Sequence, residues 1–431
     1  MNFLKKQSPV RIISLGFALV ILIGSVLLSL PCSIRDGVTL RYIDALYMST
    51  SAVCVTGLLT VDAGDTFTPL GQFFLCMLIQ IGGLGVTAVG TGVILAMGKK
   101  INLKARNLIR EAGNLDSGKG VIRFIRLVFL TTVTFELAGA ALSFLVFRKN
   151  FPPLKAAGVS LFHSVASFNN SGFDILGGGQ NLIPYQDDVL LNVVTCALVI
   201  FGGIGFLVIR EVIAKRFRWK KLSMHAKVVL FMSLVLTAAG TVLLKLTEDI
   251  TWMGAFFTSV SARTAGFSTF PLGSFSGAGL LTVIVLMVIG ASPGSTGGGI
   301  KTTTCYVLFE GIRSSATNTS EKAFRYAVPA DAFRKAAVIT LLAIGIVLSG
   351  TYILVILEPG VPFLDALFEM SSAFGTAGLS TGISAGLCDA AKILTILIMF
   401  IGRLGPLTIA SLWYFTKGER VSYPEGNIAI G

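Results

Sequence analysis

Long apolar stretches alternate with short, less apolar segments along the whole chain of 431 residues. A transmembrane helix needs about 20 apolar residues, and eight stretches meet that length. They lie at about 12–30, 69–97, 122–147, 188–209, 226–247, 277–309, 335–357 and 391–416. Taken in chain order, the eight stretches form four pairs, and one shorter segment separates the two members of each pair. These four segments lie at about 42–52, 157–167, 252–262 and 362–373. These four are too short to cross a bilayer, so we expect them to form re-entrant pore helices.

The composition agrees with a membrane protein of many spans. Hydrophobic residues make up 53% of the chain and charged residues only 13%, whereas a soluble protein carries about 25% charged residues. This charge content is too low to solvate a globule of this size. It excludes a soluble enzyme, a nucleic-acid-binding protein and a disordered regulator.

The basic residues predict the orientation in the membrane. The net charge is +13. With eight spans, five segments share one side, at 1–13, 98–126, 210–227, 301–335 and 417–431, and they hold 26 of the 35 Lys and Arg but only 8 of the 22 acidic residues. The positive-inside rule then places both termini in the cytoplasm of a multi-pass cell-membrane protein. The same basic loops could also dock a cytosolic partner.

No motif for catalysis or for a bound metal stands out. The six cysteines contain no CxxC pair, and only two histidines are present, His163 and His225. A zinc site needs several closely spaced Cys, His or carboxylate ligands. We therefore predict no catalytic residue, no enzyme activity and no metal site beyond monovalent cations.

A glycine loop recurs after each short segment. The loops read Ser51–Leu58, Ala166–Phe173, Val260–Phe267 and Ser372–Leu379, and each ends with a glycine followed by Leu or Phe. A second glycine mark follows in each later span, at Ile81–Gly85, Phe201–Gly205, Ile289–Pro293 and Ile401–Gly405. Two marks in the same order indicate four diverged repeats. We set their bounds at 1–113, 114–222, 223–328 (with a candidate gating loop) and 329–431 (with the C-terminal tail).

The repeats predict an all-α integral membrane fold of four span–re-entrant pore helix–span units, with 8 transmembrane helices and 4 pore helices. Parallel copies suit a pseudo-four-fold axis with a central pore. Non-helical backbone survives at membrane depth only against protein or a water-filled cavity. Four such loops on one axis form a ring of carbonyl oxygens that can replace the hydration shell of a cation.

The predicted selectivity filter draws on all four loops. Its candidate residues are Val53, Cys54, Val55, Thr56, Gly57, Asn169, Asn170, Ser171, Gly172, Arg263, Thr264, Ala265, Gly266, Gly375, Thr376, Ala377 and Gly378. Each loop has one glycine, whereas the TVGYG loop of potassium channels has two, so we expect fewer backbone positions in alternating conformation and fewer ordered ion sites. The alternative for each glycine is an ordinary helix C-cap.

These loops, the glycine marks in the later spans and the tail Tyr423–Gly431 resemble the Trk/Ktr/HKT superfamily of potassium transporters, most closely the bacterial Ktr membrane subunit. The resemblance covers essentially the whole chain. It implies potassium (K+) uptake that is often sodium-dependent, with Na+ as an activator or coupling ion. It also implies a membrane homodimer with one pore per subunit, opened by a cytosolic, KtrA-like ring of nucleotide-binding subunits.

The resemblance also bears on selectivity. Family members with serine in the first loop tend to favour sodium, and Gly57 therefore argues for potassium. Two transport readings stay open, because channel-like and sodium-coupled flux use the same filter. The alternative function is a non-selective or sodium-preferring cation channel or transporter of the same architecture.

The span at 277–309 is interrupted by a polar, glycine-rich run. Pro293 removes a helix donor, and a run this polar must face the cavity below the filter rather than lipid. The family assigns a gating loop to this place. Its candidate residues are Gly290, Ala291, Ser292, Pro293, Gly294, Ser295, Thr296, Gly297, Gly298 and Gly299. The alternative is a packed kink.

Three ionisable residues within the repeats need an explanation. An ionisable side chain inside a span is a functional candidate by default. Arg403 replaces a glycine of the second mark; we expect it to bond the gating loop's carbonyls, or else to pair with an acid. Arg263 should point away from the pore and pair with an acid of the short helices, such as Asp44, Asp365 or Glu369. Glu136, mid-span, is either a structural brace or a coupling-ion site.

Overall fold

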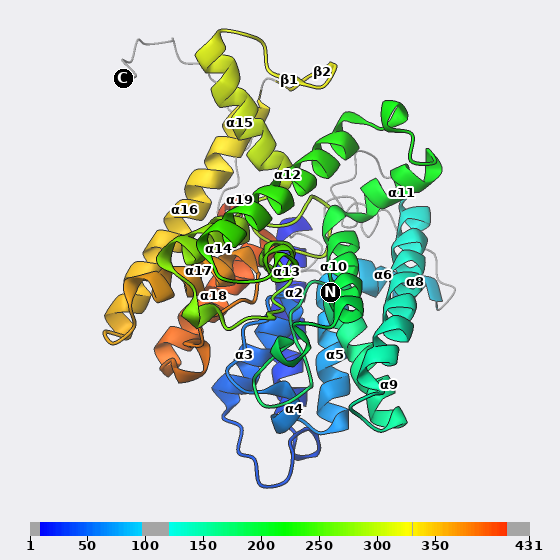
Figure 1. The fold of residues 1–431 in the computed structure, drawn as a ribbon, viewed down its shortest axis with the longest axis vertical. Helices are drawn as coiled ribbons and strands as arrows, with labels where there is room; N and C mark the ends of the chain where they lie inside the picture. Colours follow the sequence, from blue (N-terminus) through cyan, green and yellow to red (C-terminus); the bar gives the residue numbers. More distant parts are fainter. Residues whose placement is uncertain (1–8, 97–119, 330, 412–431) are drawn as a thin grey trace, which may run out of the picture.

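The structure, a computed structural model, describes residues 9–96, 120–329 and 331–411. These residues form a helical bundle with one short antiparallel hairpin, β1 (Lys322–Ala323) and β2 (Tyr326–Ala327) (Figure 1). The tail Tyr423–Gly431, the basic segment 417–431 and most of the basic segments 1–13 and 98–126 lie outside the described residues.

The same order of helices occurs four times along the chain. Each unit has a long first helix, a short pore helix, a loop, a second helix and a further helix. The first helices are α2 (Pro9–Leu28), α8 (Val121–Phe147), α12 (Met224–Thr247) and α16 (Ala332–Leu357). The short helices keep the name pore helices, after the role that the sequence predicts for them, and are α3 (Tyr42–Val53), α9 (Pro153–Phe168), α13 (Trp252–Ala262) and α17 (Phe363–Gly375). The second helices are α5 (Pro69–Leu84), α10 (Val189–Ile204), α14 (Gly277–Val288) and α18 (Asp389–Leu404). The further helices are α6 (Val86–Ala96), α11 (Phe206–Ala214), α15 (Thr302–Thr317) and α19 (Pro406–Ser411).

Short elements complete the described chain. They are α4 (Ala63–Thr66) and the 3₁₀ turns η1 (Pro31–Ser33), η2 (Ile183–Tyr185), η3 (Trp219–Lys221), η4 (Leu272–Ser274) and η5 (Ser384–Gly386). In Figure 1, α15, the hairpin and α11 lie at the upper end of the molecule, and α4 and the start of α9 lie toward the lower end.

The four first helices are the longest apolar elements, and each is long and apolar enough to cross a membrane. Large apolar side chains on them are strongly exposed, among them Leu130 (68%), Leu234 (70%) and Leu341 (70%). An apolar surface of this kind matches lipid tails. The described residues thus form a membrane protein with several spans.

The apolar segments at 69–97 and 188–209 are each broken in two. The axes of α5 and α6 differ by 102° across Gly85, and those of α10 and α11 by 97° across Gly205. Both glycines have positive φ, 86° and 99°, which other residues avoid. Four to six helices can therefore span the membrane by length and composition, depending on whether each bent pair counts as one span.

Side-chain caps fix where three second helices begin. The oxygens of Thr68, Asp188 and Ser276 accept hydrogen bonds from the backbone N–H three residues on, at 3.3, 2.9 and 3.1 Å. Such N-caps satisfy donors that the first helical turn leaves free. They fix the first turn of these three second helices.

A glycine in each first helix lets the pore helix pack closely against it. A Cβ on Gly24, Gly139 or Gly240 would collide with a serine of the following pore helix and a leucine of the second helix, and one on Gly350 would meet Met370 and Ile398. The three serines are Ser49, Ser164 and Ser259. Each donates its hydroxyl to the carbonyl three residues before the glycine, that of Ile21, Glu136 or Thr237. Sequence reasoning missed this third glycine mark.

The second glycine mark has a packing role. A Cβ on Gly82, Gly202 or Gly402 would collide with a carbonyl in the last turn of a pore helix, that of Val53, Phe168 or Phe374. Glycine here lets the second helix touch the C-terminal end of the pore helix directly. These contacts fix the height of the pore helix within each unit.

A buried ion pair joins the first repeat to the fourth. The Lys392 ammonium on α18 lies 2.6 Å from the Asp44 carboxylate on α3, and both residues are at least 94% buried. Arg41 bridges Asp44 at 3.0 Å and Asp389 at 2.9 Å. The pair thereby holds α3 and α18 together.

Removing one partner of this pair should destabilise the protein. We expect Lys392→Met to lower the free energy of unfolding by about 3 kcal/mol, because it leaves the Asp44 carboxylate buried and only partly compensated. Adding Asp44→Asn should recover most of that loss. The midpoint of thermal unfolding in detergent measures both effects. A double variant less stable than the single one would contradict this account of the pair.

Candidate ion pathway

The structure brings the four loop glycines together at one point. A Cβ built on Gly172 would lie 2.7 Å from the Gly266 Cα, and one on Gly378 would lie 2.9 Å from the Gly57 Cα. One on Gly266 would lie 3.1 Å from the Gly378 Cα. A side chain would fit at these distances only if the neighbouring backbone moved. The four repeats therefore meet at their glycines, as the register of the sequence marks predicts.

Each loop carries two left-handed residues, not one. Besides Gly57, Gly172, Gly266 and Gly378, the residues two positions earlier have positive φ: Val55 (55°), Asn170 (58°), Thr264 (75°) and Thr376 (48°). The expectation that a single glycine per loop limits the alternating conformation is wrong, and the number of ordered ion sites stays a prediction. Non-glycine residues in this region cost about 1–3 kcal/mol each and persist only where their surroundings hold them. Alternating backbone conformation therefore spans three residues in every loop.

This alternation leaves a set of buried carbonyls without donors. The N–H groups of Thr56, Ser171, Ala265 and Ala377 turn back to pore-helix carbonyls at 2.7–2.9 Å. Their own carbonyl oxygens lie next to the glycine of a neighbouring loop. Within the described part of the chain, nothing donates a hydrogen bond to these four oxygens. A buried carbonyl without a hydrogen-bond donor is unfavourable unless another group or ion binds it. A ring of four such oxygens can coordinate a dehydrated cation.

The pore helices add a favourable field. All four end directly before the loop that carries the ring, at Val53, Phe168, Ala262 and Gly375. A helix C-terminus carries about half a negative charge. Four of them at one place favour a cation there.

The first residues of the candidate filter do not line the ring with their side chains. Val53 and Gly375 belong to the pore helices. The Asn169 amide bonds Gln80 and Glu136 of flanking helices. The ring itself is built from the glycine of each loop and the residue before it.

Arg263 points away from the ring, but its expected acidic partner is wrong. Its guanidinium donates to the Ser233 carbonyl at 3.1 Å, the Ser233 hydroxyl at 3.3 Å and the Thr237 hydroxyl at 3.4 Å. Both residues lie on α12, the first helix of the same repeat. The brace is therefore made by neutral oxygens rather than by Asp44, Asp365 or Glu369.

The glycine-rich run between α14 and α15 lies directly against the loops. The Gly298 N–H donates to the Thr376 hydroxyl at 2.9 Å, and a Cβ on Gly297 would collide with Thr264. The run is tied to α10 and α11 by the bonds Ser292 N–H to Gly203 O, 3.0 Å, and Phe206 N–H to Gly294 O, 3.1 Å. It touches the loops of two repeats and the broken second span of a third.

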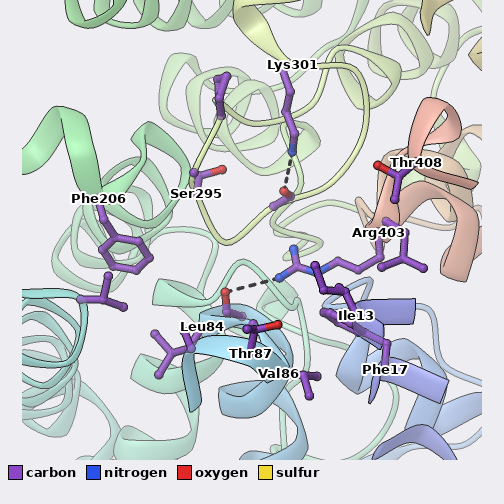
Figure 2. A pocket seen from close by; sticks show the side chains of 18 of the residues that line it. Ile13, Phe17, Leu84, Val86, Thr87, Phe206, Ser295, Lys301, Arg403 and Thr408 are labelled. Carbon is purple, nitrogen blue, oxygen red and sulfur yellow. Dashed lines mark hydrogen bonds between the residues drawn. The ribbon is translucent and has the colours of Figure 1, made fainter. Parts of the chain in front are cut away.

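Two cations hold this run inside a cavity of about 380 Å³ (Figure 2). Arg403 donates to the carbonyls of Thr296, Gly82 and Gly83, so its partners are carbonyls and not an acid. The Lys301 ammonium donates to the Gly297 carbonyl at 2.8 Å and the Gly298 carbonyl at 3.2 Å. No Asp or Glu is among the described residues lining the cavity. Sequence reasoning missed Lys301, although it stands only two residues after the glycine run.

A second cavity, of about 490 Å³, opens on the other side of the ring. It is lined by Gly57, Gly266 and Gly378 together with loop residues that include Asp174. Burial, with a smaller contribution from the nearby Asp62 and Asp65 carboxylates, raises the pKa of the Asp174 carboxyl to about 7, although the hydrogen bond from the Leu176 N–H lowers it. Asp174 is therefore largely neutral below pH 7 and negative above it.

This titration predicts a pH dependence of cation capture from that cavity. One extra negative charge near the entrance is worth about 1 kcal/mol, or about fivefold in apparent affinity. We expect the apparent dissociation constant for a monovalent cation to fall by up to this factor as the pH rises from 6 to 8. Asp174→Asn should hold it at the low-pH value, whereas Asp36→Asn, at an exposed loop site, should keep the dependence. An identical pH profile in Asp174→Asn would contradict the role.

Comparison with known proteins agrees with this geometry. A family model described as TrkH, cation transport protein, matches residues 10–416. The chain belongs to the TrkH family of cation transport proteins. It is accordingly a multi-pass membrane transporter and not an enzyme.

Two relatives resemble the chain along nearly all of its length. It is 36% identical to the Ktr system potassium uptake protein B of Bacillus subtilis, over 98% of this chain and 97% of that protein. It is 35% identical to the potassium/sodium uptake protein NtpJ of Enterococcus hirae, over 99% and 98%. The crystal structure of the potassium transporter TrkH from Vibrio parahaemolyticus shares the fold, with a TM-score of 0.75 and 19% identity over 95% of this chain and 86% of the other.

Proposed function

We propose that this chain carries potassium into the cell through the ring formed by its four glycine loops. The observation that carries the proposal is the set of four buried carbonyls, of Thr56, Ser171, Ala265 and Ala377, around the meeting point of the glycines. Carbonyl oxygens replace the hydration shell of potassium at low cost. The potassium-uptake name of the Bacillus subtilis relative supports the same ion.

The proposed architecture is eight transmembrane helices and four pore helices in repeats 1–113, 114–222, 223–328 and 329–431. The fourfold order of helices supports it. Both termini are proposed to be cytoplasmic. The described basic segments 210–227 and 301–335 support this orientation, since they include η3 and the hairpin at the same end of the molecule as α11 and α15 (Figure 1).

The glycine-rich run Gly290–Gly299 is proposed as the gate, with Arg403 as its lock. Its position between the ring and a cavity lined by two cations supports this role. A cytosolic nucleotide-binding ring, KtrA-like, would open it, and the membrane part would act as a homodimer. The word "system" in the name of the Bacillus subtilis relative supports a partner subunit.

Uptake is proposed to depend on sodium, and one relative motivates a second candidate. The Enterococcus hirae protein carries the name potassium/sodium uptake protein. The second candidate is therefore a transporter of the same architecture that is non-selective or prefers sodium.

Uptake in cells tests the proposal. The chain is expressed with and without a Ktr-type regulatory subunit in bacteria that lack their own potassium uptake. Growth and 86Rb uptake at low potassium are then measured at several sodium concentrations. Growth rescue that rises with sodium is expected, while no rescue in any combination would refute potassium uptake. Uptake that sodium and potassium inhibit equally would favour the second candidate.

A further inference from the structure

A buried carboxylate lies directly behind the second loop. Glu136, on α8, is 7% exposed and accepts a hydrogen bond from the Asn169 amide at 2.9 Å. Asn169 is the first residue after pore helix α9 and stands three residues before Gly172. Gln80, on α5 of the first repeat, accepts from the same Asn169 amide at 2.9 Å and donates to Glu136 at 3.4 Å. One cluster thus joins the second loop to helices of two repeats.

This carboxylate has amide partners but no cation. Within the described residues, Glu136 forms no ion pair with Lys, Arg or His. A carboxyl group buried at membrane depth without a charge partner is unfavourable. An apolar residue at the same place would be less unfavourable for the folded protein, because it has no charge to desolvate. Stability alone therefore does not explain Glu136.

The same place exists behind every loop, but its occupants differ. Glu136 corresponds to Ile21, Thr237 and Val347, which stand three residues before the close-packing glycine of their own first helices. Asn169 corresponds to Cys54, Arg263 and Gly375, three residues before each ring glycine. In the third repeat the corresponding side chains also meet, since Arg263 donates to the Thr237 hydroxyl at 3.4 Å. In the first and fourth repeats these positions offer no comparable polar pair.

We propose that Glu136, through Asn169, fixes the second loop and thereby sets the preference for potassium over smaller monovalent cations. The proposal deepens the proposed function and depends on it. Glu136 acts here as a positioning residue, because it reaches the ring only through Asn169. It distinguishes the second loop from the other three and so breaks the four-fold symmetry of the ring.

The physical reason lies in the strained residue that follows the anchor. Asn170 has a φ of 58°. It stands in the chain between Asn169 and Ser171, whose carbonyl belongs to the ring. Glu136 and Gln80 hold Asn169 from behind, which keeps Asn170 in its left-handed conformation. Without the anchor, the Ser171 carbonyl can move inward toward a smaller ion. Sodium then gains coordination that the wild-type ring denies it.

The test measures ion binding in Glu136→Leu, with Thr132→Val as the matched control. Thr132 lies one turn earlier on α8, is fully buried, and its hydroxyl has no partner among the described residues. Dissociation constants for potassium and for sodium are measured by titration calorimetry on the purified full chain. A hydrogen bond to a charged group is worth about 1.5–3 kcal/mol, so the preference for potassium should fall about tenfold or more. Thr132→Val should keep the wild-type ratio.

Two further readouts separate this role from simple stabilisation. Glu136→Gln keeps the shape of the side chain and an acceptor for Asn169, so this variant should retain most of the wild-type preference for potassium over sodium. The thermal midpoint of each variant reports any loss of folding. Should Glu136→Leu fail to fold, Asn169→Ala removes the same bond from the loop side and should show the same loss.

The outcomes distinguish the inference from the function on which it depends. No preference for potassium in the wild-type chain would overturn the proposed function. A wild-type preference that Glu136→Leu or Asn169→Ala retains in full would overturn only this inference. So would loss of sodium-stimulated 86Rb uptake with an unchanged binding ratio, because that result assigns Glu136 to a coupling-ion site.

Discussion

Replacing Gly57 with serine should lower the preference for potassium over sodium by about tenfold or more, since a left-handed non-glycine residue costs about 1–2 kcal/mol before any clash. Gly57 has a φ of 99°, and its Cβ would collide with the Ser171 carbonyl and lie 3.2 Å from the Gly378 Cα. The serine must therefore displace a carbonyl of the ring. Competition of potassium and sodium against 86Rb uptake measures the change.

The matched control is Gly360→Ser. Gly360 lies in an exposed loop, and its Cβ would meet nothing within 4 Å. This variant should keep the wild-type selectivity. Unchanged selectivity in Gly57→Ser, at normal expression, would show that the first loop takes no part in choosing the ion.

Removing the Arg403 guanidinium should raise ion flux in the absence of any regulatory subunit. Arg403 holds the Thr296 carbonyl of the glycine-rich run against the Gly82 and Gly83 carbonyls of α5. Losing even one charged hydrogen bond, worth about 1.5–3 kcal/mol, shifts a closed–open equilibrium by about 10- to 100-fold. We expect Arg403→Ala to raise 86Rb uptake within that range.

Two comparisons make the Arg403 result specific. Arg403→Lys keeps the charge but has fewer donors, so its uptake should fall between those of wild type and Arg403→Ala. Arg148→Ala removes an exposed arginine at the far end of α8 and should change nothing. Flux in Arg403→Ala equal to wild type, at equal amounts in the membrane, would contradict the lock.

The sequence was informative wherever a repeat made single glycines visible. Gly57, Gly172, Gly266 and Gly378 stand in register because each must approach a neighbouring backbone, and that requirement leaves its mark in every copy. The expectation that Arg403 bonds carbonyls also agrees with the structure. Polar, non-helical backbone at membrane depth must contact protein or a water-filled cavity, and this limits where the glycine-rich run can lie.

Other features depended on contacts that a sequence does not display. Val55 and Thr264 are β-branched and belong among the least expected residues at positive φ, so only the loop geometry reveals them. Arg263 was assigned an acidic partner because charges usually pair, yet Ser233 and Thr237 lie nearer. Lys301 was overlooked because its partners are the carbonyls of the run that precedes it.

Potassium binding to the purified chain tests the central claim most directly, because three of the ring glycines line the cavity of about 490 Å³ and are open to ions from it. Titration calorimetry in detergent would compare potassium with sodium for the wild-type chain and for Gly57→Ser. We predict that wild type binds potassium at least about tenfold more tightly than sodium, a difference of about 1.4 kcal/mol, and that Gly57→Ser loses this preference. Equal binding of the two ions by wild type would contradict a potassium-selective carbonyl ring.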